Sequence, residues 1–275
     1  MTRRNCPEAT NLRPHGPLHF NRALVRAPAA SVVRGLRAVD RGSPTLAGVQ
    51  REFETYVAAL KSAGVAVETL PPLEEFPDSI FMEDPALVFP EAAIILRPGA
   101  PSRLGEAAAI APELRRRFDR TLELRDGFVE GGDILTTPRE VLIGLSTRTD
   151  ERGATGLRSL LEQLGRRGRI VTTPPGVLHF KTDCSLLDEE TVLCTERLAA
   201  SGVFDDYRVV LTPPGEEAAA NSLRVNDSVF VGSGFPRTVD RLTANAYRVV
   251  TLPNAQIALL DAGFSCLSLR WRGPC

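Results

Sequence analysis

The chain has 275 residues, 43% of them hydrophobic, and its 33 basic and 34 acidic residues leave a net charge of -1. This length is enough to bury a substantial core, and the balanced charge argues against a nucleic-acid or membrane-surface partner. No apolar run approaches the roughly 18 residues of a membrane span, and the first residues lack the apolar stretch of a signal peptide, so we expect a cytoplasmic protein.

Residues 1–19 are polar and contain proline, so we expect a flexible N-terminal arm there. A single catalytic domain is expected over residues 20–275. It opens with the apolar run NRALVRAP, a helix over about 46–63 and a strand VAVETLPP.

From residue 83 onward the chain repeats one pattern four times. Each copy has a polar first position, two short apolar runs joined by a turn, a helical stretch and a β-branched strand closed by Pro in most copies. The helices are expected at about 102–118, 154–164 and 238–245, with a short one in the third copy. A fifth copy is split, because the terminal run CLSLRW needs the strands and helix near the N-terminus to complete it.

The first positions of the five copies, Glu83, Glu130, His179, Ala220 and Cys266, are separated by 47, 49, 41 and 46 residues. Such a period is typical of repeat and propeller architectures. In a closed α/β ring, equivalent positions face the common axis, so the four reactive residues of this set should converge. The alternative is that an α/β chain rich in hairpins looks periodic by chance.

Cys266 gains interest from this placement, although a free cysteine is more often a buried, inert core residue. A thiol needs a neighbouring base or a lowered pKa to attack, and His179 is a candidate base that Glu130 would orient. The alternatives are a satisfied core histidine at position 179 and a tight turn over 130–133.

The segment FPDSIFMEDP places three carboxylates, Asp78, Glu83 and Asp84, within seven positions. Clustered carboxylates repel unless a cation joins them, and a planar guanidinium suits them well. They could instead be capping or loop acids, and a divalent-metal site fits poorly. Arg97 and Arg148 follow the second strand of successive hairpins, where they could clamp a substrate carboxylate or simply be surface arginines.

No metal or cofactor site is predicted, since the cysteines and histidines show neither a CxxC pair nor the spacing of a zinc site. A disulfide framework is equally unexpected. The residues concerned are Cys6, Cys184, Cys194, Cys266, Cys275, His15, His19 and His179.

Several segments resemble the dimethylarginine dimethylaminohydrolase family of the guanidino-group-modifying (pentein) superfamily, over Phe20 to Trp271. They are FPDSIFMEDP, ILRPGAPSRLGE, FVEGGDIL, IGLSTRTDERG, VLHFKT, GFPRT and DAGFSCLSLRW. The resemblance implies a five-bladed α/β propeller, a small-molecule substrate, no cofactor, and a homodimer as one option. It also implies hydrolysis of asymmetric dimethylarginine or monomethylarginine to citrulline and an amine, through a covalent cysteine intermediate.

Carried over position by position, the resemblance makes Cys266 the nucleophile, His179 the general acid and base, and Glu130 the residue that orients it. The implied substrate-binding side chains are those of Asp78, Glu83, Asp84, Arg97, Arg148 and Asp261. Leu36 and Leu260 are implied to bind the substrate through their backbone carbonyls. The first 19 residues and the segment 37–48, which we expect to form a lid, depart from the family pattern.

Two other functions stay open from the sequence. Hydrolysis of unmethylated arginine needs the same catalytic residues, and one methyl group in a pocket changes affinity by only about 1–3 kcal/mol. A non-catalytic propeller that binds a partner is the other option, but it predicts loss of the cysteine, histidine and glutamate. All three are present.

Overall fold

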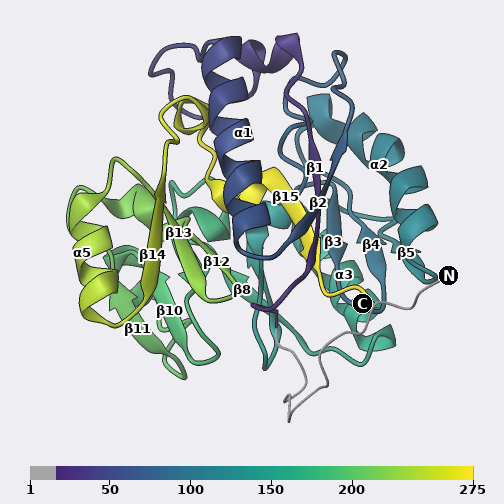
Figure 1. The fold of residues 1–275 in the computed structure, drawn as a ribbon. Coiled ribbons are helices and arrows are strands. Elements are labelled where there is room, and N and C mark those ends of the chain that lie inside the picture. The colour runs from purple at the N-terminus through teal and green to yellow at the C-terminus, as the bar shows by residue number, and fades with distance from the viewer. Residues whose placement is uncertain (1–16, 275) are drawn as a thin grey trace, which may run out of the picture.

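In the computed structural model, which describes residues 17–274, fifteen strands form five separate sheets of three strands each (Figure 1). In every sheet the middle strand pairs antiparallel with one neighbour and parallel with the other. This is the hairpin followed by a crossover that the sequence pattern predicts. The five sheets do not close into one barrel.

Four of the units follow one another along the chain, each as a hairpin, a helix and a returning strand. Their elements are β3 (Ala86–Val88), β4 (Ala93–Ile95), α2 (Leu104–Arg117) and β5 (Thr121–Glu123); β6 (Ile134–Thr136), β7 (Val141–Leu145), α3 (Glu151–Gln163) and β8 (Gly168–Thr172); β9 (Cys184–Leu186), β10 (Thr191–Cys194), α4 (Glu196–Ala199) and β11 (Arg208–Leu211); β12 (Leu223–Val225), β13 (Ser228–Gly232), α5 (Pro236–Ala244) and β14 (Arg248–Leu252).

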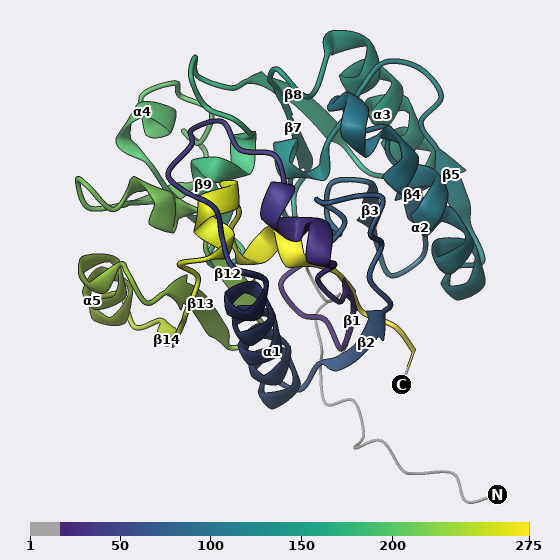
Figure 2. The ribbon, with the colours of Figure 1, turned by 90° about the horizontal axis from the view of Figure 1, so that it is seen from above.

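The fifth unit joins the two ends of the described chain, as the sequence predicts. β1 (Arg22–Arg26) pairs in parallel with β2 (Ala66–Leu70) across α1 (Leu46–Ser62), and antiparallel with β15 (Ser268–Trp271). Seen from above, the five units surround a centre (Figure 2). There the short helical turns near the C-terminus, drawn in yellow, lie beside the purple turn η1 (Ala30–Arg34). The predicted five-bladed α/β propeller is therefore confirmed.

The composition of each element explains its place in the ring. The middle strands, such as VLIGL and SVFVG, are almost wholly buried and apolar because they are covered on both faces. The helices lie outside them, and three begin at side-chain caps, Thr45 before α1, Asp150 before α3 and Thr195 before α4. The Asp150 cap starts α3 three residues earlier than the sequence predicts.

The N-terminal boundary differs slightly from the prediction. Residues 1–16 of the expected flexible arm lie outside the described residues, but Leu18 is already buried among apolar side chains and its carbonyl accepts a hydrogen bond from the Asn226 amide. The packed structure thus includes residues before Phe20. Among the helices of residues 17–274, none combines the length and the apolar character that a membrane span requires.

Candidate active site

A pocket lies at the axis of the ring, and the first residues of several repeat units line it. Glu130 directly precedes the turn η3 (Gly131–Asp133) and β6, while His179 precedes η4 (Phe180–Thr182) and β9. Cys266 lies in η7 (Phe264–Leu267), immediately before β15. All three line one pocket, although up to 136 residues separate them in the chain. The periodic spacing brings them together as expected.

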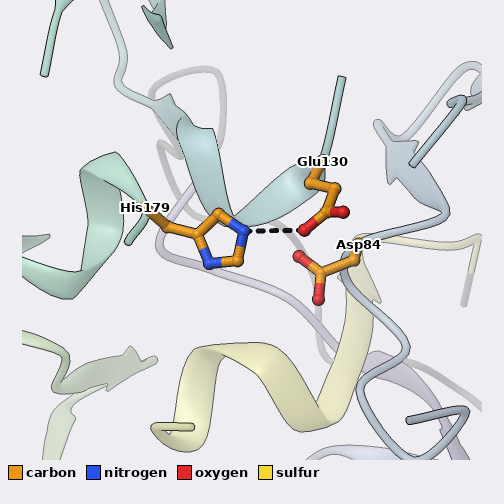
Figure 3. Close-up of side chains that lie close together, drawn as sticks. All are labelled: Asp84, Glu130 and His179. Atoms are coloured by element: carbon orange, nitrogen blue, oxygen red, sulfur yellow. Dashed lines mark hydrogen bonds and ion pairs between the residues drawn. The ribbon is translucent and has the colours of Figure 1, made fainter. Parts of the chain in front are cut away.

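Glu130 and His179 form a short hydrogen bond in this pocket. The Nε2 atom of His179 lies 2.7 Å from Oε2 of Glu130, whose side chain is fully buried (Figure 3). The other carboxylate oxygen, Oε1, accepts a hydrogen bond from the Ala100 amide at 3.0 Å. Glu130 is therefore held in place on both sides, and it fixes the orientation of the imidazole ring.

The environment of His179 favours the imidazolium. Burial alone would lower its pKa, but the hydrogen bond to Glu130 and the negative charges of Asp133 and Asp84 outweigh that effect and raise the pKa from 6.5 to about 9. The ring consequently carries a proton at neutral pH. It can donate that proton to a leaving group.

Glycine at position 132 leaves room for this ring. A Cβ atom there would lie 2.7 Å from Cγ of His179 and 3.1 Å from an oxygen of Asp84. The Gly132 amide also donates to Oδ1 of Asp84 at 2.9 Å. The Glu-Gly-Gly-Asp sequence is thus more than a tight turn. Its second glycine lets His179 and Asp84 approach the backbone closely.

Asp84 is buried and held by Arg103, whose Nη1 contacts Oδ2 of the carboxylate. Burial would raise the pKa of Asp84, but the charges of Arg103 and His179 outweigh burial and keep it below the usual value. Arg103 also pairs with Glu106 at 2.7 Å and donates to the carbonyls of Asp78 and Phe81. The pocket therefore contains a carboxylate that is ionised at neutral pH.

Sequence reasoning did not single out Arg103, although it lies in the quoted motif ILRPGAPSRLGE and lines the pocket. Its spacing of three from Glu106 was the available signal, since such pairs meet on one helical face. Arg97, which was singled out, does not line this pocket. Its guanidinium lies 4.9 Å from the ring centre of Phe128 and donates to the Arg125 carbonyl.

Arg148 does line the pocket, and its Nη1 lies 3.5 Å from Oε1 of Glu130. It lies three residues past the end of β7, whereas Arg97 lies two residues past the end of β4. Arg97 forms an isolated antiparallel bridge with Val129, whereas Arg148 lies in the turn after β7, where its amide donates to the hydroxyl of Ser146. The two arginines are for this reason not equivalent, contrary to the expectation from the repeat.

Cys266 is partly buried and free. Burial is the main cause that raises its pKa from 9.0 to about 11, and the charges of Asp84 and Glu83 add to it, against smaller opposing effects of a hydrogen bond with the Gly263 backbone and of Lys181. The thiol is thus protonated at neutral pH. A positive charge that enters the pocket favours the thiolate, which is the nucleophilic form.

Glu83 does not line the pocket with Cys266, although the sequence groups it with the other acids. Its carboxylate pairs with Lys181 at 2.5 Å and with Arg270 at 3.2 Å, and it borders a larger cavity of about 620 Å³. That cavity contains neither Cys266 nor His179. Both cations contact Oε1 of Glu83, whereas its Oε2 is buried without a hydrogen-bond partner.

The rim of the pocket is built from the segment after Leu36 and from the turn at Asp261. The Leu36 amide donates to Oδ1 of Asp78 at 2.9 Å, and the Ala38 amide donates to Asp261. Asp261 has a left-handed backbone with φ of 54°, which turns its side chain toward this segment. Leu36 and Leu260 both line the pocket. The expected lid over 37–48 borders the site up to residue 38, and its last residues begin α1.

A metal ion could in principle be held where Asp84, Glu130 and His179 each offer a ligand atom, since these atoms lie within 4.8 Å of one another. Each of the three already has a strong partner, however: Asp84 has Arg103, and Glu130 and His179 have each other. A proton held by His179 up to about pH 9 would also compete with a metal. The donor set suits acid and base chemistry better.

Comparison with known proteins adds sequence relatives. The model of the arginine deiminase family matches residues 108–258. The N(G),N(G)-dimethylarginine dimethylaminohydrolase of Pseudomonas aeruginosa is 36% identical over 254 residues, which cover 92% of this chain and all of that protein. The protein of the same name from Streptomyces coelicolor is 29% identical, covering 91% of this chain and 97% of that one.

Solved structures agree with these matches. A dimethylarginine dimethylaminohydrolase from Pseudomonas aeruginosa, in complex with citrulline, superposes with a TM-score of 0.89 at 35% identity, covering 92% of this chain and 99% of that one. The N-terminal domain of a cyanobacterial arginine dihydrolase gives a TM-score of 0.79 at 15% identity, covering 92% and 98%. The second likeness concerns the fold alone.

Proposed function

Because this chain belongs to the dimethylarginine dimethylaminohydrolase family, we propose that it hydrolyses the guanidino group of N-methylated arginine, either asymmetric dimethylarginine or monomethylarginine. The products are citrulline and dimethylamine or methylamine. The observation that carries the proposal is one pocket lined by a thiol, an imidazolium and an ionised carboxylate, namely Cys266, His179 and Asp84. The protein is a hydrolase of carbon–nitrogen bonds in linear amidines.

The charges of the pocket suit a guanidinium. Asp84 is ionised, and Asp78 lies beside it. Burial raises the pKa of Asp78, and the charge of Arg103 opposes this effect. A guanidinium that docks against these carboxylates brings a positive charge close to Cys266. That charge compensates for the burial and the acids that keep the thiol protonated, so substrate binding itself favours the thiolate.

The reaction then proceeds in two halves. The Cys266 thiolate attacks the central guanidino carbon, and His179 gives its proton to the departing methylated amine, which leaves a covalent thiouronium. The now neutral His179 takes a proton from water while the water oxygen attacks the same carbon. The carbon–sulfur bond breaks, which releases the ureido product and returns the thiol.

The amino-acid end of the substrate has candidate partners at the rim. Arg148 offers a partly exposed guanidinium for the α-carboxylate. The carbonyls of Leu36 and Leu260 and the carboxylate of Asp261 border the same side, where they suit an α-amino group. We assign no carboxylate contact to Arg97 and no guanidinium contact to Glu83, because the structure directs both elsewhere.

The test is product analysis with the purified protein. We expect asymmetric dimethylarginine to yield citrulline and dimethylamine in equal amounts, and a quenched reaction to contain enzyme whose intact mass is raised by a covalent adduct on Cys266. Cys266→Ser should abolish both while keeping the wild-type unfolding curve. Turnover by the serine variant would rule out the cysteine mechanism.

Unmethylated arginine is the second candidate substrate, favoured by the match to the arginine deiminase family over residues 108–258. The two candidates differ only in whether the space beside Cys266 accepts N-methyl groups. Competition among asymmetric dimethylarginine, monomethylarginine and arginine, followed by release of dimethylamine, methylamine and ammonia, separates them. The cytoplasmic location, the homodimer and the single catalytic domain over residues 20–275 stay predictions.

A further inference from the structure

The fourth repeat unit contributes Asn221 to the axis, at the place where other units contribute a catalytic residue. Asn221 follows the turn η5 (Glu217–Ala220) and precedes β12. Its Nδ2 atom lies 3.9 Å from Sγ of Cys266, within the range of a hydrogen bond to sulfur. No role for Asn221 follows from the mechanism above.

The orientation of the Asn221 amide is fixed by a second hydrogen bond. The hydroxyl of Ser265 donates to Oδ1 of Asn221 at 2.9 Å. Since the oxygen is occupied in this way, the Nδ2 group, which can only donate, is the end that faces the sulfur. Ser265 thus sets the direction of the donor toward its own neighbour in the chain, Cys266.

Gly263 packs closely against the side-chain amide of Asn221. A Cβ atom on Gly263 would lie 2.3 Å from Cγ of Asn221. The backbone of Gly263 is extended, with φ of -119°, so a left-handed conformation does not explain the glycine. The close approach of Asn221 does explain it, and it places the amide against the turn that carries Cys266.

The sulfur needs such a donor because its charged surroundings oppose the thiolate. Asp84 and Glu83 raise the pKa of Cys266, and among the charged side chains that affect it only Lys181 acts in the opposite direction. Lys181 is itself paired with Glu83. A neutral N–H donor stabilises a thiolate without adding a charge that would repel a cationic substrate.

We propose that Asn221 is a catalytic hydrogen-bond donor to Cys266, which holds the sulfur in place and stabilises its thiolate, and that Ser265 and Gly263 position this donor. The inference rests on the proposed function insofar as Cys266 is the nucleophile. It predicts a change in the chemistry of the thiol that a purely structural role of Asn221 would not produce.

The experiment measures alkylation of Cys266 by iodoacetamide between pH 6 and pH 11 in the full chain, followed by mass spectrometry of the Cys266 peptide. Asn221→Ala should slow alkylation about tenfold at pH 8 and move the titration of the thiol to higher pH, with a similar fall in kcat/KM for methylarginine. Ser265→Ala removes the hydroxyl that orients the donor and that itself lies 3.9 Å from Sγ of Cys266, and a smaller effect of about threefold is expected.

The chain offers a matched control. Asn254 packs against Gly232, where a Cβ atom would lie 2.6 Å from the Asn254 side chain, as Asn221 packs against Gly263. Asn254→Ala should therefore resemble Asn221→Ala in unfolding free energy but leave the alkylation profile of Cys266 unchanged. Gly263→Ala, which displaces Asn221 instead of removing it, should reproduce the chemical defect.

An alkylation profile for Asn221→Ala within twofold of wild type at every pH would overturn the proposal, whatever happens to stability. Alkylation does not require turnover, so it is independent of the substrate assignment. If the wild-type protein failed to hydrolyse methylarginine but Asn221→Ala still shifted the thiol titration, the proposed substrate would be wrong and the role of Asn221 would stand.

Discussion

Glu130→Gln is the substitution with the most specific expected effect, because it removes one charge from the His179 environment and leaves the shape of the side chain. The pKa of His179 rises from 6.5 to about 9, which corresponds to about 3 kcal/mol in favour of the imidazolium. A hydrogen bond to a charged group, such as the one from His179 to Glu130, contributes about 1.5–3 kcal/mol to this stabilisation of the imidazolium. We therefore expect the pKa of His179 to fall to between about 7 and 8 in the variant.

The same change should appear in stability. Below pH 6.5 both the folded and the unfolded chain hold the His179 proton, so its full contribution is present. As the pH rises toward 9, the unfolded chain loses the proton while the folded chain keeps it, and the unfolding free energy falls by about 3 kcal/mol. In Glu130→Gln this loss should shrink to about 1 kcal/mol.

Two measurements check the prediction: a titration of the ¹⁵N-labelled imidazole by NMR, and urea unfolding at pH 6 and pH 9. The chain has only three histidines, and His179→Gln identifies the resonance and provides the control without a titrating group. A His179 pKa that stays near 9 in Glu130→Gln, or one near 6.5 in the wild type, would refute the electrostatic account of the acid.

Three further substitutions test the packing around the pocket. Gly132→Ala should push the His179 ring away from Glu130 and lower kcat/KM by about 100-fold, since small misplacements of a catalytic group are costly. Asp261→Gly tolerates the left-handed backbone but removes the carboxylate, so trypsin should cleave faster at Arg41 in the rim segment. Arg103→Met leaves two buried carboxylates unpaired and should cost about 3–5 kcal/mol of unfolding free energy, measured in urea.

Each of these has an outcome that contradicts it. Wild-type turnover in Gly132→Ala would show that the ring has more room than the 2.7 Å contact allows. Unchanged proteolysis of Asp261→Gly would mean that its carboxylate does not hold the rim. Arg103→Met with wild-type stability would mean that the two acids are protonated in the native state.

The sequence predicts the ring and the convergence of Glu130, His179 and Cys266 because both follow from a repeated unit. The fourth first position expected there, Glu83, borders the larger cavity instead. Glu130 and Cys266 are 136 positions apart, yet each occupies the same place in its unit, so closure of the ring is enough to bring them into one pocket. The split fifth unit could be predicted for the same reason, since β15 has the pattern of a first strand and lacks a partner nearby in the chain.

The partners of individual charges could not be predicted in this way. Three carboxylates in FPDSIFMEDP look alike in the sequence, but Asp84 pairs with Arg103 while Glu83 pairs with Lys181. Which way each side chain points depends on the local backbone conformation, since Arg97 lies in an antiparallel bridge and Arg148 in a turn. A repeat period of 41 to 49 residues does not define register to one position.

The split fifth unit also affects how the chain folds while it is being synthesised. The ribosome releases β1 early, but its antiparallel partner β15 comes last of the described strands, and Cys266 lies just before it. Until then, the edge of β1 is unpaired and the pocket lacks its sulfur. A nascent or prematurely terminated chain can therefore complete four units, yet it exposes a free strand edge that invites aggregation and degradation. Cys266 and the strand that closes the ring belong to one short segment, so a chain that stops before this segment has neither the nucleophile nor the closed ring.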